Sequence, residues 1–216
     1  ALGMVAWQLY VAGVDAVTDS ATLIRHGARK PNFGFPQAPW RLFASVFLHA
    51  GWIHLLANTF ILVTWGQIVA RLVGSLAFLA SLAVCGVWGS LASDILGPEA
   101  LALGASGATS GLVLFVLVQA LVAKRRAEWQ GESRQWFLVS AAVVGLNLGM
   151  TLGSLQMAGA QLDHWAHLGG AATGMLLGLF AWRDAGTRKS GIWVGLVLLT
   201  VVGACTIWWR GSTPFG

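Results

Sequence analysis

The feature that most constrains this chain is a series of long segments without Asp, Glu, Lys or Arg. Each of these segments is close to or longer than the ~20 residues that a helix needs to cross a bilayer. They cover residues 42–70, 72–93, 100–123, 135–162, 164–182 and 190–209. We therefore expect an all-α integral membrane protein that crosses the bilayer several times.

The composition agrees with this expectation. Hydrophobic residues make up 56% of the 216 residues and charged residues only 10%, too few to cover a soluble domain of this size. The formal net charge of +5 does not indicate nucleic-acid binding, because most basic residues fall in short loops between apolar runs. Cys85 and Cys205 both lie in apolar runs and predict neither a disulfide framework nor a metal site.

A shorter apolar stretch at residues 1–14 precedes these runs and is interpreted as a truncated first helix. Seven helices would then form one polytopic membrane domain over residues 1–216. We expect its core, a six-helix arrangement, at about 40–183 and an additional C-terminal helix at about 190–209. Arg71 is expected to mark the turn between the helices of the first two runs.

The basic residues are distributed unevenly between the two ends of these helices. One group is Arg71, Lys124, Arg125, Arg126, Arg134, Arg183, Arg188 and Lys189, and the other is Arg25, Arg29, Lys30, Arg41 and Arg210. Because cytoplasmic loops carry the excess of Lys and Arg, the first and larger group is predicted to be cytoplasmic.

Polar side chains inside membrane helices are costly unless they face protein or water, which makes them functional candidates. The candidates are His49, His54 and Asn58 in the helix of the first run, Ser106 at the start of the third, and His164 and His167 at the start of the fifth. His54 and Asn58 are four residues apart and share one helical face. Asp163 and His164 are expected at the mouth of their helix, in contact with water.

Ser106 would lie in the first turn of its helix, where unpaired backbone N–H groups and the helix dipole stabilise negative charge. A serine nucleophile there, with a histidine base at another helix start and a His/Asn donor pair, would suit acyl transfer. The alternative is that the small residues of Ala102–Gly111 serve helix packing alone and that the histidines bond neighbouring helices.

Glycines provide the means for two of these helices to meet. Gly170, Gly174 and Gly178 form a stripe that begins three residues after His167. This stripe is expected to approach Gly107 and Gly111 of the Ser106 helix closely, since small residues allow backbones to come together.

Four motifs together resemble the rhomboid family of intramembrane serine proteases. The sequence "PWRLF" holds the first-loop pair Trp40-Arg41, "HAGWIHLLAN" holds His49, His54 and Asn58, "GASG" holds Ser106, and "AHLGG" holds His167. The resemblance extends from Trp40 to about Gly178, which is most of the chain.

The resemblance implies a catalytic pair of Ser106 and His167, without a carboxylate, in a water-filled cavity below the membrane surface. It also implies that His54, Asn58 and the backbone N–H groups of Ser106 and Ala105 bind the oxyanion. His49, Trp40 and Arg41 would have structural roles.

The same resemblance predicts the partners. Substrates would be transmembrane proteins, cut near a small residue where their helix unwinds, close to the non-cytoplasmic face. Membrane lipid surrounds the protein, and no nucleic acid, metal or organic cofactor is expected. The expected location is a bacterial-type cytoplasmic (inner) membrane.

Two positions depart from the family pattern, and two other functions are open. Ala70 stands where the family commonly has Glu, four residues before Gly74-Ser75, and His164 stands where Asn is frequent. One rival is a catalytically silent rhomboid-like protein that binds or escorts membrane clients. The other is a transporter or metal-dependent enzyme that uses the histidines, although HExxH and carboxylates at ligand spacing are missing from the sequence.

The end of the run 135–162, with the loop to Asp163, is a candidate gate and cap.

Overall fold

The chain folds into helices, as its apolar runs predict. A computed structural model describes residues 2–12, 20–30, 36–97, 101–125, 131–152, 163–181, 193–200 and 202–203. Within these ranges there is no strand, only an isolated antiparallel bridge between Arg29 and Ala102. The elements are α1 (Leu2–Ala12), α2 (Ser20–Arg25), α3 (Arg41–Ala44), the 3-10 helix η1 (Ser45–Phe47), α4 (Trp52–Val73), α5 (Ser75–Leu96), α6 (Ser106–Arg125), α7 (Glu132–Leu152) and α8 (His164–Phe180).

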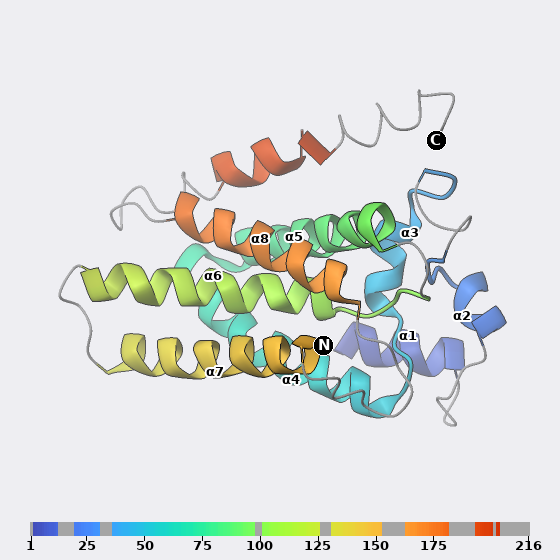
Figure 1. Ribbon diagram of the computed structural model, residues 1–216, viewed down its shortest axis with the longest axis horizontal. Coiled ribbons are helices and arrows are strands. Elements are labelled where there is room, and N and C mark those ends of the chain that lie inside the picture. The colour runs from blue at the N-terminus through green and yellow to red at the C-terminus, as the bar shows by residue number, and fades with distance from the viewer. Residues whose placement is uncertain are drawn as a thin grey trace.

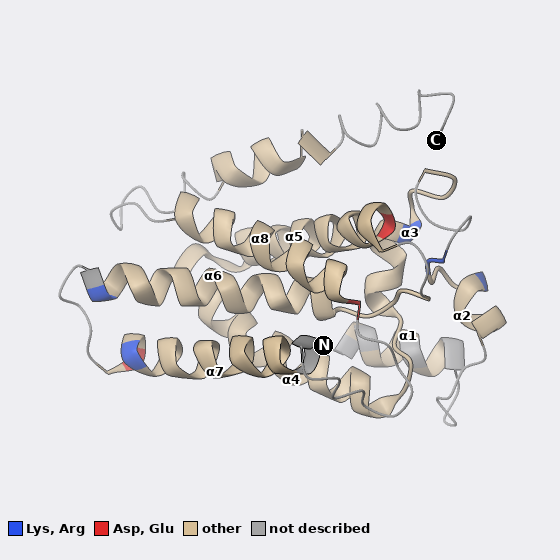
Figure 2. Cartoon of the chain, viewed as in Figure 1, with Lys and Arg blue, Asp and Glu red and all other residues tan. Residues whose placement is uncertain are grey.

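The long helices form a bundle that suits a membrane. Three of the described helices are long and apolar enough to cross a bilayer, namely Trp52–Val73, Ser75–Leu96 and Ser106–Lys124. Helices α7 and α8 run alongside them (Figure 1). Charged residues gather near the two ends of the bundle, and the middle is free of them (Figure 2). Because lipid is a poor solvent for charge, this distribution agrees with an integral membrane protein.

Helix α6 lies at the centre of the bundle, in contact with α4, α5, α7 and α8 (Figure 1). Its side chains Leu112, Phe115 and Val116 are almost completely buried. Two buried hydrogen bonds join helices in the interior: Trp65 Nε1 donates to Ser140 Oγ (2.8 Å) between α4 and α7, and Gln119 Nε2 donates to the Gly178 carbonyl (2.7 Å) between α6 and α8. The helix that begins at Ser106 is therefore packed against four other helices.

The closest contact in the bundle lies between the backbones of α6 and α8. A Cβ atom at Gly170 would overlap the carbonyl group of Gly107, and a Cβ atom at Gly174 would overlap that of Gly111. Helix α5 joins the same contact through Gly89, where an added Cβ would lie 2.7 Å from the carbonyl oxygen of Ala166. The glycine stripe of the sequence thus lies where only residues without a side chain fit.

The helix of the first apolar run is shorter than that run, and the prediction that His49 lies within it is wrong. Leu48 is extended (φ −92°, ψ 147°) and so is Gly51, so the chain leaves the helical path after η1 and α4 begins only at Trp52. His49 is fully buried in this connection. A run of uncharged residues does not reveal such a break, because burial in protein and burial in lipid require the same residue types.

The turn between α4 and α5 also lies beyond its predicted place. Arg71 belongs to the last turn of α4, and the helix ends at Gly74, whose φ of 91° favours glycine. The N–H of Gly74 donates to the carbonyl oxygen of Ala70 (2.8 Å), so the backbone at Ala70 contributes to this helix end.

The predicted C-terminal helix is described only in part. Residues 193–200 and 202–203 are helical, and Trp88 Nε1 of α5 donates to the carbonyl oxygen of Leu199 (3.2 Å). The remainder of the run 190–209 and the proposed gate segment at 153–162 lie outside the described residues.

Substituting Gly174 with Ala tests the α6–α8 contact. We expect Gly174→Ala to lower the free energy of unfolding by about 1–3 kcal/mol, because its Cβ has no space beside Gly111. Gly145 of α7 is a matched control, since an added Cβ there meets nothing within 4 Å. Gly145→Ala should be neutral or raise stability by up to about 1 kcal/mol. Unfolding in detergent, followed by circular dichroism, gives both values, and equal losses would contradict the assignment.

Candidate active site

The segment that leads into α6 holds Ser106 in a fixed place. The backbone of Ala102 pairs with that of Arg29, and the N–H of Gly104 donates to the carbonyl oxygen of Ser45 (2.9 Å). Gly104 has a φ of 113°, which turns the chain sharply into the helix. Ala105 is buried, and Ser106 begins α6 as predicted. The N–H groups of this first turn have no partners within the helix, so they point to the position that an anion would occupy.

Helix α4 places its His54/Asn58 face against this turn. An added Cβ at Gly104 would lie 2.6 Å from Cε1 of His54, so the imidazole lies directly against the loop before Ser106. Asn58 Nδ2 donates to the His54 carbonyl oxygen (3.0 Å), and Asn58 Oδ1 lies 3.3 Å from the hydroxyl oxygen of Thr109. That hydroxyl also lies 3.2 Å from the carbonyl oxygen of Ser106. Thr109, for which helix packing is the expected role from sequence, therefore links Asn58 to the first turn of α6.

Helix α8 approaches the same turn from the other direction. An added Cβ at Gly107 would lie 2.9 Å from the carbonyl oxygen of Ala166. This contact is one residue from Ser106 on α6 and one residue from His167 on α8. The N–H of His167 donates to the carbonyl oxygen of Asp163 (3.1 Å), which closes the first turn of α8. Ser106, His167 and the His54/Asn58 face consequently lie at one junction of three helices.

His49 lies behind His54, with the two ring centroids 5.0 Å apart. It precedes α4 and is fully buried. Burial, and to a smaller extent the nearby His54, lowers the pKa of His49 to about 3. The His49 ring is therefore neutral near pH 7 and supports the His54 ring by contact.

Trp40 and Arg41 fix the first loop. Arg41 is 8% exposed and donates to the carbonyl oxygens of Ile24 and Ala28. Its guanidinium carbon lies 4.6 Å from the centroid of the Trp40 ring. These contacts join the start of α3 to α2 and to the segment that follows α2.

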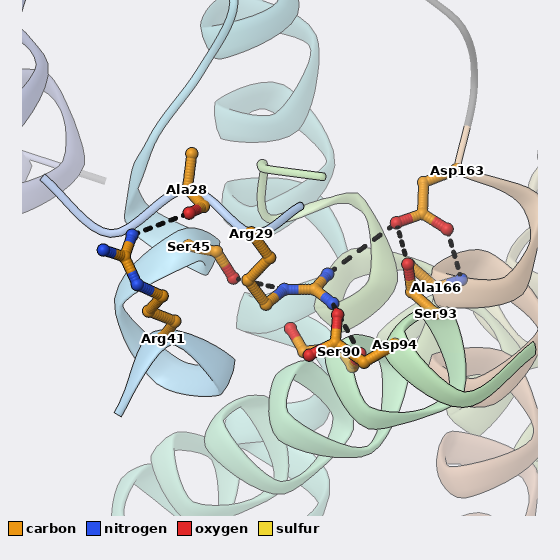
Figure 3. A network of polar contacts seen from close by, with 9 residues as sticks. All are labelled: Ala28, Arg29, Arg41, Ser45, Ser90, Ser93, Asp94, Asp163 and Ala166. Carbon is orange, nitrogen blue, oxygen red and sulfur yellow. Dashed lines mark hydrogen bonds and ion pairs between the residues drawn. The ribbon is translucent and has the colours of Figure 1, made fainter. Parts of the chain in front are cut away.

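Asp163 lies at the mouth of α8 as expected, but it is less exposed than a solvated side chain would be. Its side chain is only 17% exposed and is the N-cap of α8, where Oδ1 accepts from the N–H of Ala166 (2.9 Å). Its other oxygen, Oδ2, accepts from the hydroxyl of Ser93 (2.6 Å) and lies 3.7 Å from the guanidinium of Arg29 (Figure 3).

The histidines do not form a metal site in the part of the chain that the structure describes. Nowhere in these ranges do three or more His, Cys, Asp or Glu side chains group in an arrangement that could hold a metal ion. The geometry thus brings together a serine, a histidine and an amide, which are the components of nucleophilic acyl transfer.

Known proteins are similar to this chain in sequence. A family model described as "Rhomboid domain" matches residues 36–184, which is well over half of the chain. The chain belongs to the rhomboid family. It is accordingly an integral membrane protein of a family that includes serine proteases.

Three relatives illustrate the range of this family. Rhomboid protease GluP of Bacillus subtilis is 32% identical over 190 residues, 86% of this chain and 33% of the relative. RHOMBOID-like protein 7 of Arabidopsis thaliana is 35% identical over 152 residues, 67% of this chain and 46% of the relative. Rhomboid-type serine protease 2 of Emericella nidulans is 28% identical over 162 residues, 73% of this chain and 30% of the relative. The chain thus spans between about a third and a half of the length of these proteins.

Proposed function

We propose that this rhomboid protein is an intramembrane serine endopeptidase with Ser106 as nucleophile and His167 as base. The observation that carries the proposal is the contact of Gly107 with the Ala166 carbonyl, which brings the two residues to one junction. Membership of a family with relatives named as proteases gives it independent support.

In the proposed reaction the Ser106 hydroxyl attacks a peptide carbonyl while His167 accepts its proton. The resulting tetrahedral intermediate collapses, and His167 gives the proton to the leaving amine, which leaves an acyl group on Ser106. Water then attacks this ester with His167 again as base, and the acid product leaves as the serine hydroxyl is restored. The protons and bonds of both half-reactions balance with the substrate, the side chains of Ser106 and His167, and one water molecule.

We assign the stabilisation of the oxyanion to His54, Asn58 and the backbone N–H groups of Ala105 and Ser106. The Asn58 amide has two N–H groups, of which one binds the His54 carbonyl and the other is assigned to the oxyanion. The Thr109 hydroxyl beside Asn58 Oδ1 supports this orientation of the amide. Donors held in place before the reaction stabilise the developing charge without reorganisation.

We further propose that the substrates are transmembrane proteins and that the site opens on the non-cytoplasmic side of a bacterial-type cytoplasmic membrane. The buried arginines Arg29 and Arg41 support this orientation. Their charges lie inside the protein, so they do not count as exposed basic residues on the non-cytoplasmic side, and the excess on the cytoplasmic side becomes larger. The Bacillus subtilis relative, which aligns with 86% of the chain, supports the choice of membrane. The whole domain, residues 1–216, is proposed to act as one unit.

Replacement of the nucleophile is the decisive experiment. In proteoliposomes with a single-span model substrate, Ser106→Ala should lower cleavage about 10³-fold or more, and a fluorophosphonate should label only the protein that retains Ser106. Ser110 lies one turn further along α6, so Ser110→Ala is the matched control and should retain activity. Cleavage that survives Ser106→Ala would exclude this nucleophile. Substrate binding without cleavage or labelling would favour a client-binding protein.

The oxyanion assignment predicts a graded loss. Asn58→Ala should lower kcat about 10²–10³-fold, because a donor to the transition state is removed. Thr109→Val removes only the partner of Asn58 Oδ1 and should lower kcat about 10-fold. Asn147 of α7 bonds the Val143 carbonyl (2.9 Å) as Asn58 bonds that of His54, so Asn147→Ala is the control. Equal rates for Asn58→Ala and Asn147→Ala would disprove the assignment.

The orientation is checked by cysteine accessibility in intact cells. In a background without Cys85 and Cys205, Arg25→Cys and Lys124→Cys place thiols at exposed positions at opposite ends of the bundle. A membrane-impermeant maleimide should modify residue 25 directly and residue 124 only after permeabilisation. The reverse pattern would overturn the proposed orientation.

A further inference from the structure

A buried charge cluster lies beside the junction of Ser106 and His167 (Figure 3). At its centre is Arg29 of the first loop, whose side chain is 3% exposed, and its acidic partners are Asp94 and Asp163, which are 9% and 17% exposed. A charge is costly to bury unless it is paired and hydrogen-bonded. The Arg29 guanidinium is paired in this way, and its contacts show which parts of the chain it joins.

The Arg29 side chain reaches three elements at once. Its Nε donates to Ser45 Oγ of η1 (3.0 Å). One terminal nitrogen donates to the carbonyl oxygen of Ser90 (2.6 Å) and forms an ion pair with Asp94, both of α5. The other lies 3.7 Å from Oδ2 of Asp163 at the start of α8. A planar group with five fixed donors suits such a meeting point, whereas an ammonium group does not.

Through Asp163, this cluster determines where α8 begins. The two carboxylate oxygens of Asp163 face opposite ways: Oδ2 faces Arg29 and Ser93, and Oδ1 caps the N–H of Ala166. The carbonyl oxygen of Asp163 accepts from the N–H of His167. Both hydrogen bonds of the first turn of α8 thus go to one residue, Asp163, through its side chain and its backbone, and His167 lies at the end of that turn.

Through its backbone, Arg29 also holds the segment before Ser106. Its N–H donates to the carbonyl oxygen of Ala102 (3.0 Å), and its carbonyl oxygen accepts from the N–H of Ala102 (2.8 Å). Ser45, whose hydroxyl accepts from Arg29, uses its own carbonyl oxygen to hold the N–H of Gly104. The loop into α6 and the cap of α8 consequently share one anchor.

We propose that Arg29 is a positioning residue that sets the distance and orientation of His167 relative to Ser106. This inference rests on the proposed function of these two residues. A displacement of about 1 Å in the reacting groups can cost ~10²-fold in rate, so a residue that fixes both helix starts governs the efficiency of proton transfer. Arg41, the other buried arginine of this region, donates to the carbonyl oxygens of Ile24 and Ala28.

The test measures two quantities separately: the fraction of protein molecules with a folded site, and the rate at which Ser106 reacts in those molecules. Wild type, Arg29→Gln and Arg29→Lys are reconstituted as full chains in proteoliposomes, with Arg25→Gln as control because Arg25 is an exposed arginine of the same loop. For each protein, kcat and KM are measured with the single-span substrate. A fluorophosphonate time course then gives the final labelled fraction, which counts folded sites, and the labelling rate, which reports nucleophile activation.

For Arg29→Gln we expect kcat and the labelling rate to fall about 10–100-fold, with KM within about 2-fold and a final labelled fraction near that of wild type. Arg29→Lys retains the charge beside Asp94 but not the fork of donors, so it should recover part of the rate. Arg25→Gln should match wild type in every quantity.

A role in folding alone would give a different result. In that case Arg29→Gln would lower the final labelled fraction and leave the labelling rate of the remaining sites unchanged, and the proposal would be wrong. If Arg29→Gln does not fold, Asp163→Asn takes its place, because Asn still caps a helix but lacks the charge that faces Arg29. An unchanged labelling rate in Asp163→Asn would overturn the proposal. Wild type that neither cleaves nor labels would instead refute the proposed protease function.

Discussion

The contact between the backbones of α6 and α8 is the interaction on which the rest of this structure depends. Inside a bilayer, burial of apolar side chains gives helices little reason to associate, since lipid tails are equally apolar. Close packing must supply that reason, and here it does so through Gly107 and Gly111 on one helix and Gly170 and Gly174 on the other. The same contact brings the starts of two helices, one with Ser106 and the other with His167, to one point.

Packing of glycines alone leaves the helices free to slide along or turn about each other, since the contact has no side chains that interlock. The polar cluster around Arg29 removes this freedom at one end, where backbone and side chain of the same residue hold the segment before Ser106 and the cap of α8. At the other end, the hydrogen bond from Gln119 to Gly178 limits the same motion. Apolar contact thus sets the distance between the helices, and polar contacts set their register.

Much of this arrangement was accessible from sequence because the signals are local. A charge-free run predicts a membrane helix, a small-residue segment predicts close approach, and the motif around Ser106 predicts where α6 begins. The break at Leu48–Gly51 was missed because His49, Ala50 and Gly51 are as compatible with a helix start as with a turn. The Arg29 cluster was missed for another reason: Asp94 and Asp163 are far from Arg29 in the chain, and no local pattern records which charges will meet.

The partnership of Arg29 with Asp163 has a consequence for the order in which the protein is assembled. Arg29 is made early and Asp163 only after four long helices, α4 to α7, have been synthesised. Until α8 has entered the bundle, the Arg29 guanidinium lacks one of its two carboxylate partners, Asp163. The end of the molecule that holds Ser106 and His167 is therefore completed only once α8 is in place, and a chain that stops before α8 lacks both Asp163 and His167.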